Sequence, residues 1–348
     1  MEQRSTISIP GVRKVDASEG SGAVFRLKAY PRLHFGLIDL SGYTPRSYGG
    51  VGASLQGMPI EVECQATKSA GLMLDPGELG EDTLSTVNRA VAIAGENGLG
   101  TRGEIRFKSI PSSHIGLGST TLTVLATLQC LAIINQWTVT PDDLVIMSTC
   151  GRTSGIGIGT FFTGKLVVDV GQAGHPANYD YMPSLAPGQR PPSLTIGSWA
   201  MPETWNVSLF FTQDSPSIKP EVESDFFHSA TPVATSDVGL QLAHLYHGII
   251  PAVIEGDLHA FAKSLRIFQR VGFKAAEISA QRTIVRSLLT ALWDQEFAAG
   301  LSSFGPVVFV FHESTESLEP GRHFPAEIAH AGPFSVNNRG FEFERGAE

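Results

Sequence analysis

A glycine-rich turn followed by three hydroxyl residues is the strongest local signal for chemistry in the sequence. Residues 110–121 read IPSSHIGLGSTT and stand between an expected strand and an expected apolar helix. Two glycines let the backbone turn with its amides facing inward, and the hydroxyls lie beside the unsatisfied amides of the helix start. Such a helix start binds phosphate or pyrophosphate, the alternative being a capped turn without ligand. The residues expected to contact the anion are Gly116, Leu117, Gly118, Ser119, Thr120 and Thr121.

A second glycine-rich stretch, residues 32–52, gathers groups that could bind an anion. Arg32, His34 and Arg46 are positive or can become so, and an arginine can form two parallel hydrogen bonds to phosphate or carboxylate oxygens. The run of Tyr48, Gly49 and Gly50 permits a close approach of the backbone to a ligand. We therefore expect the three cationic residues to be catalytic and this run to bind substrate. The alternative is a surface hairpin with solvated arginines.

Two further turns rich in glycine and serine stand beside expected strands. Residues 151–159 read GRTSGIGIG, and residues 300–306 read GLSSFGP before an apolar strand. Each segment alone is typical of a simple turn. Four such segments in one chain favour a binding site. Other signals are weaker, because His244 and His247 lack a third metal ligand and no GxSxG nucleophile motif occurs.

Composition limits the class of protein. The chain has 348 residues, with 25 Lys+Arg against 34 Asp+Glu, and 42% of its residues are apolar. This length and this apolar content predict two globular domains. An acidic chain lacks the basic stripe that nucleic acids need, so we expect no nucleic-acid partner.

The cysteines and the N-terminus indicate the compartment. Cys64, Cys130 and Cys150 are too few and too widely spaced for a disulfide framework or a CxxC metal pair. The first sixteen residues lack the apolar core of a signal peptide, and the longest apolar stretch is too short to span a bilayer. We expect a cytoplasmic protein without a membrane partner.

The elements that must position these segments divide into two halves. Residues 1–22 are expected to form a flexible arm, and residues 173–198 are a proline-rich loop with little periodicity. A strong strand at 204–212 then opens the second half. We therefore predict a first domain over 23–200, which contains the phosphate loop, and a second over 201–348.

The second half is expected to be mostly helical. Three helices are expected between 237 and 298, with Pro251 kinking or splitting the first of them. Residues 315–348 are expected to form a polar tail with weak structure. A strand or hairpin is expected over 161–170 in the first half. Because strands and helices interleave without regular βαβ order, the fold class is predicted to be α+β.

The four segments, in this order, resemble the GHMP superfamily of small-molecule kinases, whose phosphate loop reads P-x-x-x-G-L-G-S-S. They are most similar to one branch, the β-ribofuranosylaminobenzene 5′-phosphate synthases. That family carries R-L-H-x-G-L-x-D-L, R-x-x-G-G-x-G, T-S-G-I-G and S-S-[WF]-G-P. The matching residues here are 32–40, 46–52, 153–157 and 302–306, and the stretch FQRVGFKAAE within 261–277 is similar as well.

This resemblance implies a fold and an activity. The fold would be GHMP-kinase-like, with an N-terminal ribosomal-S5-domain-2-like domain and a C-terminal ferredoxin-like α/β sandwich. The activity would be phosphoribosyl transfer from phosphoribosyl pyrophosphate to 4-aminobenzoate or a related aromatic acid. Pyrophosphate and CO2 would be released, on the route to methanopterin-type cofactors. The resemblance also implies Mg2+ and a homodimer.

The resemblance adds residues to the expected site. Ser154 is added as a catalytic residue, and the metal ligands stay open, with Asp39 and Asp169 as candidates. The added substrate-binding residues are Gly155, Ser302, Ser303 and Gly305.

One position separates this chain from the kinases. GHMP kinases commonly carry an acidic residue in S-G-x-D, where it acts on the substrate hydroxyl, but Gly157 stands there in this chain. The synthase family usually has G-L-G-S-G-T-Q in its phosphate loop, whereas this chain has Thr120 after Ser119 and Leu122 in place of Gln. A GHMP-type kinase and a non-catalytic ligand-binding relative remain the alternative functions.

Overall fold

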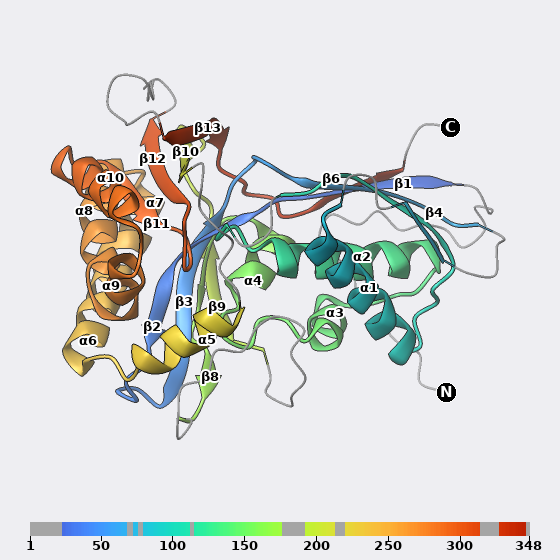
Figure 1. Cartoon of the computed structure of the whole chain (residues 1–348), viewed down its shortest axis with the longest axis horizontal. Coiled ribbons are helices and arrows are strands. Elements are labelled where there is room, and N and C mark those ends of the chain that lie inside the picture. Colours follow the sequence, from blue (N-terminus) through green and yellow to red (C-terminus); the bar gives the residue numbers. More distant parts are fainter. Residues whose placement is uncertain are drawn as a thin grey trace.

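A five-stranded sheet covered by helices on one face forms the first lobe of the computed structural model (Figure 1). Its strand order is β14-β1-β4-β6-β5, and the helices α1, α2 and α3 pack beneath it. The bounds are β1 Val24–Ala29, β4 Ile60–Gln65, β5 Leu72–Asp75, β6 Gly103–Ser109, β14 Glu342–Arg345, α1 Glu81–Glu96, α2 Ser119–Ile134 and α3 Pro141–Ser148. The structure describes residues 23–67, 72–75, 79–111, 115–175, 192–212, 220–313 and 327–345. The expected arm over 1–22 lies outside them.

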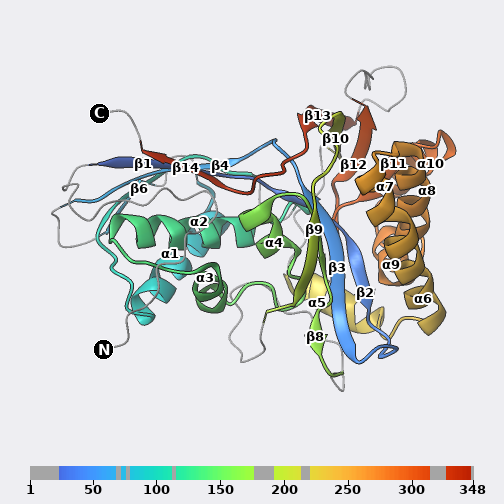
Figure 2. The same cartoon turned by 180° about the vertical axis from the view of Figure 1, so that it is seen from behind.

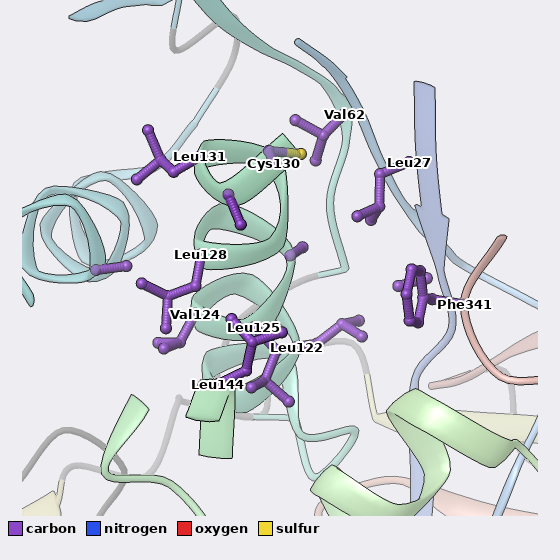
Figure 3. Close-up of a cluster of buried hydrophobic side chains, with 14 of the residues drawn as sticks. Leu27, Val62, Leu122, Val124, Leu125, Leu128, Cys130, Leu131, Leu144 and Phe341 are labelled. Atoms are coloured by element: carbon purple, nitrogen blue, oxygen red, sulfur yellow. The ribbon is translucent and has the colours of Figure 1, made fainter. Parts of the chain in front are cut away.

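Helix α2 is the centre of the first lobe. Nearly all of its side chains are buried, because its sequence is apolar on every side. Leu128 and Leu131 point to one side of the helix in Figure 3, while Val62 and Leu27 approach from the sheet. A helix buried in this way holds the turn at its N-terminus in a fixed place.

A second sheet stands between the two lobes (Figure 2). Its order is β2-β3-β7-β9, with the short β8 paired to β3. The bounds are β2 Arg32–Asp39, β3 Arg46–Ser54, β7 Leu166–Asp169, β8 Gln172–Ala173 and β9 Thr195–Trp199, with α4 Ile156–Thr163 packed on it. All pairings are antiparallel, and Gly50 lies opposite Asp169.

The second lobe is an antiparallel four-stranded sheet of order β11-β12-β10-β13, with helices packed on it (Figure 1). Phe35 of β2 stacks on Phe309 at 5.2 Å and meets Phe261 edge-on, so an aromatic core joins this lobe to the central sheet. The α+β prediction is confirmed. The strands are β10 Trp205–Thr212, β11 Ala298–Leu301, β12 Val308–Glu313 and β13 Ile328–Ser335. The helices are α5 Pro220–Ser229, α6 Thr235–His244, η1 Leu245–Ile249, α7 Ile250–Glu255, α8 Leu258–Gln269, α9 Gly272–Ser279 and α10 Thr283–Asp294.

Two expectations about local structure are corrected. The polar tail expected over 315–348 is wrong for residues 328–345, because β13 completes the second sheet and β14 pairs with β1 of the first. Phe341 is 2% exposed and stacks on Phe161 at 4.7 Å, so the end of the chain contributes to the core. Phe161 belongs to α4, so the strand expected over 161–170 is present only as β7 over 166–169. The chain therefore returns to the first lobe after the second is built.

Two further findings concern the helices. The expected interruption at Pro251 is confirmed, because a π-helical turn separates α6 from α7, where Pro251 stands in the first turn. No helix in the described ranges has both the length and the apolar character to cross a membrane.

Candidate active site

A pocket opens where α2 begins and is lined by residues of β2, α5 and α9. Each of the four glycine-rich segments contributes residues to its walls, as do the two helices. The Tyr48–Gly50 run of the second segment does not. The lining residues are Arg32, His34, Leu37, Thr121, Gly151, Arg152, Thr153, Ser154, Gly157, Glu223, Phe226, Phe227, Phe273, Glu277, Ser303 and Phe304.

The phosphate loop has the geometry of an anion site. Gly118 caps α2 in the left-handed region (φ 74°), and neither a side-chain cap nor an acidic residue occupies the first turn. A Cβ at Gly118 would lie 3.0 Å from Nε of Arg32, whose Nη1 donates to the Gly116 carbonyl at 2.7 Å. The Arg32 guanidinium therefore lies beside the first backbone amides of α2, those of Ser119 and its neighbours. Both can donate hydrogen bonds to one anion. Thr121 lines the pocket there.

The other members of this segment have structural roles. Leu117 is buried, and its carbonyl accepts a hydrogen bond from the Arg32 amide at 3.1 Å. Thr120 is the second residue of α2, and Leu122 packs in the core (Figure 3). The departures from the family pattern at these two positions therefore lie in a regular helix. Ser112, Ser113 and His114 lie outside the described residues.

The Ser302–Gly305 turn braces the phosphate loop against β2. The hydroxyl of Ser302 donates to the Gly116 carbonyl at 2.7 Å and accepts from the His34 amide at 3.1 Å. A side chain at Gly116 would collide with the Ser302 carbonyl. Ser303 lines the pocket and its amide donates to the His34 carbonyl at 2.9 Å, whereas Gly305 (φ 77°) closes the turn. Of the expected residues in this turn, the structure places Ser303 at the pocket and the other two behind it.

A hydrogen-bonded chain of three side chains runs from the pocket into the central sheet. His34 Nε2 lies 2.9 Å from Ser154 Oγ, which in turn lies 3.4 Å from Asp169 Oδ2. The amide of Gly155 donates to the same carboxylate oxygen at 3.0 Å. A Cβ at Gly50 would lie 3.2 Å from His34 Nε2. Gly50 therefore makes room for the imidazole ring, whereas a close approach to ligand was expected.

Burial sets the charge states of His34 and Asp169. Desolvation, with Arg32 and Lys274 adding to it, holds the pKa of His34 well below its ordinary value, so the imidazole is neutral. Burial raises the pKa of Asp169 to about 7, although the amides of Gly171 and Gly155 oppose the shift. His34 is therefore a neutral hydrogen-bonding group beside the cationic Arg32 and Lys274.

Three expected residues lie away from the pocket. Arg46 donates from Nε to the Val170 carbonyl at 2.8 Å and from Nη2 to the Gly171 carbonyl at 2.7 Å. Tyr48 is 2% exposed within an aromatic core, and a Cβ at Gly49 would lie 3.0 Å from a β7 carbonyl. This segment pairs β3 with β7 and β8, and the structure does not place these three residues in the lining of the pocket.

The two expected metal candidates are engaged by the protein itself. The Asp39 carboxylate accepts from the Ser41 amide and hydroxyl, each at 3.0 Å, and from the Thr44 amide at 2.7 Å. Burial opposes ionisation, but these donors prevail and lower its pKa. Both oxygens of Asp169 accept from backbone amides. In the described part of the chain, no group of three His, Cys, Asp or Glu residues is placed to bind a metal ion.

A wall of four phenylalanines was not expected from the sequence. Phe226 of α5 lies 4.6 Å from Phe304 and 5.7 Å from Phe273, measured between ring centroids. Phe227 lies 4.8 Å from Phe273. Only Phe304 and Phe273 stood in segments that carried a signal, GLSSFGP and FQRVGFKAAE. The wall makes one side of the pocket apolar.

A buried ion pair on α9 was also missed. Lys274 Nζ lies 2.5 Å from Glu277 Oε2 and donates to the Ser303 carbonyl at 2.7 Å. Lys274 is fully buried and Glu277 is 6% exposed. Arg152 of the GRTSG segment adds a second cation to the pocket, and Glu223 of α5 adds a carboxylate. Spacing on α9 could have indicated the pair, because it is an i, i+3 pair.

Solved structures of small-molecule kinases share this fold. Homoserine kinase from Cytophaga hutchinsonii matches with a TM-score of 0.65 at 14% identity, covering 96% of this chain and 100% of that chain. Phosphomevalonate kinase from Streptococcus pneumoniae matches with a TM-score of 0.61 at 10% identity, covering 93% and 99%. These likenesses establish the fold, so the GHMP-kinase-like prediction is confirmed.

Sequence comparison adds the family. Beta-ribofuranosylphenol 5′-phosphate synthase from Methanothermobacter thermautotrophicus is 31% identical over 309 residues, which cover 87% of this chain and 92% of that protein. The protein of the same name from Archaeoglobus fulgidus is 30% identical over 292 residues, covering 84% and 88%. No protein-family model matches the chain. The chain belongs to the beta-ribofuranosylphenol 5′-phosphate synthase family, an enzyme family, which confirms the resemblance drawn from its motifs.

Proposed function

We propose that this enzyme transfers the phosphoribosyl group of phosphoribosyl pyrophosphate to an aromatic acid, with release of pyrophosphate and CO2. The observation that carries the proposal is a pocket that joins Arg32 and the start of α2 to a wall of four phenylalanines. A diphosphate fits the loop, and an aromatic ring fits the wall. The name of the relatives contains a phenol, so we propose 4-hydroxybenzoate as the acceptor in preference to 4-aminobenzoate.

The bonds of this reaction balance without a covalent enzyme intermediate. The bond between C1 of ribose and the diphosphate oxygen breaks, and its electron pair leaves with pyrophosphate. The ring carbon that bears the carboxylate then bonds to C1. The carbon–carboxylate bond breaks next, CO2 leaves, and its electron pair restores the aromatic ring.

The pocket supplies what this departure needs. Negative charge grows on the pyrophosphate as positive charge grows at C1, and prearranged donors lower the cost of that separation. Arg32 and the first amides of α2 are such donors, and both are held by the brace around Gly116. Neutral His34, fixed by Ser154, offers a hydrogen bond without adding charge.

Three further features belong to the proposal. Mg2+ is expected to arrive with the diphosphate as part of the substrate, because Mg2+ is commonly bound through phosphate oxygens. The enzyme is expected to act as a cytoplasmic homodimer, which sedimentation of the purified protein tests. Its product is expected to feed the synthesis of methanopterin-type cofactors.

The acidic residue that GHMP kinases carry in S-G-x-D is replaced in this pocket. Gly157 lines the pocket where GHMP kinases carry an acid, and Asp39 and Asp169, the expected substitutes, do not line it. A Cβ at Gly157 would lie 3.3 Å from Thr121 Cγ2, so a carboxylate there would stand beside the phosphate loop.

The test uses purified protein, Mg2+, phosphoribosyl pyrophosphate and carboxyl-labelled 4-hydroxybenzoate or 4-aminobenzoate. We expect pyrophosphate and labelled CO2 in equal amounts from at least one acid, and no ATP consumption with sugar or alcohol substrates. Binding of phosphoribosyl pyrophosphate without turnover would favour the non-catalytic relative. Robust ATP turnover would favour the kinase.

A further inference from the structure

Glu277 is a buried carboxylate at the wall of the pocket, where it is paired with Lys274. Its side chain lines the pocket and the residue is 6% exposed. Oε2 lies 2.5 Å from Lys274 Nζ in an ion pair. Burying two charges costs free energy, which the pair offsets only when the remaining lone pairs are hydrogen-bonded as well. A carboxylate at the wall of a pocket can gain such a hydrogen bond from a group of a bound ligand.

The surroundings of Glu277 indicate which ligand group it meets. Phe273 stands four residues earlier on α9, so the two side chains lie on the same face of the helix and both line the pocket. Phe226 and Phe304 continue the aromatic wall. A substituent on an aromatic ring seated against this wall can reach Glu277.

We propose that Glu277 is the catalytic base for the ring hydroxyl of the acceptor, an inference that rests on the proposed function. The hydroxyl O–H bond breaks and the proton moves to the Glu277 carboxylate while the ring attacks C1 of ribose. The electron pair of the O–H bond becomes a C=O bond, so the ring of the intermediate is an uncharged dienone that still bears the carboxylate. When CO2 leaves, its electron pair returns to the ring, the C=O becomes a C–O bond, and Glu277 returns the proton.

Charges around Glu277 suit this exchange. Burial raises the pKa of Glu277 to about 7, while Lys274 opposes the shift. A base whose pKa lies near the working pH transfers protons in both directions most effectively. In the described part of the chain, the charged groups acting on Glu277 are Lys274 of its own helix, Arg32 of β2 and Glu223 of α5.

The nature of the acceptor makes this role testable. A ring hydroxyl must lose its proton to give a neutral intermediate. A ring amine donates its lone pair more strongly and forms an iminium group without first losing a proton. The reaction of 4-hydroxybenzoate therefore depends on the base more than the reaction of 4-aminobenzoate does.

The experiment compares both acceptors in the full-length enzyme. Glu277→Gln should lower kcat with 4-hydroxybenzoate by about 100-fold or more and lower it with 4-aminobenzoate by less than about tenfold. The acidic limb of the pH profile of kcat/KM for the hydroxy acid should disappear in this variant. Glu223→Gln, which alters another carboxylate of the same pocket, should affect both acceptors by the same factor.

Each outcome decides the matter. Equal losses with both acceptors, with the acidic limb retained, would show a structural role for Glu277. If the unmodified enzyme turned over 4-aminobenzoate and not 4-hydroxybenzoate, the role of Glu277 would be refuted, but the proposal of phosphoribosyl transfer would not. Turnover of neither acid would refute the proposed function itself. If Glu277→Gln does not fold, the Glu277→Gln/Lys274→Met variant removes both buried charges, and the same acceptor ratio is measured there.

Discussion

Arg32 and Arg46 were expected from the sequence to share one role, and the structure separates them. Arg32 lies over the phosphate loop, 2.7 Å from the Gly116 carbonyl, and lines the pocket. Arg46 binds two carbonyls at the end of β7. Replacing each arginine by alanine therefore tests whether the pocket has been located correctly.

The expected magnitudes follow from these contacts. Arg32→Ala removes a charged donor from the proposed pyrophosphate site, and hydrogen bonds to charged groups contribute about 1.5–3 kcal/mol. The dissociation constant for pyrophosphate should therefore rise roughly 10- to 150-fold. Arg46→Ala should leave that constant unchanged and lower the thermal midpoint, because the carbonyls of Val170 and Gly171 lose their donors.

The assay is isothermal titration with inorganic pyrophosphate, paired with a thermal melt of each variant. Arg32→Lys separates charge from geometry, because lysine keeps the charge but cannot reproduce the planar fork. Its affinity should lie between those of the unmodified protein and Arg32→Ala. A loss of affinity in Arg46→Ala as large as that in Arg32→Ala would refute this placement of the site.

Three further predictions follow from the other walls of the pocket. Ser154→Ala should lower kcat by about 2- to 12-fold, because His34 loses a hydrogen bond of about 0.5–1.5 kcal/mol; an unchanged kcat would contradict the positioning of His34. Phe226→Leu should raise KM for the aromatic acid by a similar factor, because a ring pair contributes about 0.5–1.5 kcal/mol, whereas affinity for pyrophosphate should not change. Burial raises the pKa of Glu277 from 4.5 to about 7. The contribution of this carboxyl to the free energy of unfolding is therefore complete below pH 4.5, and about 3 kcal/mol of it is lost as the pH rises to 7. Thermal midpoints at pH 5 and pH 8 should differ less in Glu277→Gln than in the unmodified protein, and an equal difference would show that Glu277 ionises normally.

Much of the first lobe and of the phosphate loop could be predicted from local sequence. The apolar run of α2 and the glycines before it define a buried helix with a bare N-terminus, because both features depend on neighbours in the chain. The family was also predictable, since its motifs are contiguous. The role of β14 was not, because its pairing with β1 joins residues from opposite ends of the chain.

The sequence by itself determined which residue types are available for binding an anion. Arg32, His34 and Ser154 were named from motifs, and all three line the pocket. Each motif carries its own backbone geometry, so local patterns are enough to find it.

Only the tertiary structure decided which of these residues meet and what surrounds them. It placed Arg46 against β7 and brought Phe226, Phe273 and Phe304 together from three separate segments. Burial of Glu277 against Lys274 likewise arises only when α9 packs beside β2. Contacts between distant segments and the desolvation of a charge depend on packing, which no local pattern of residues contains.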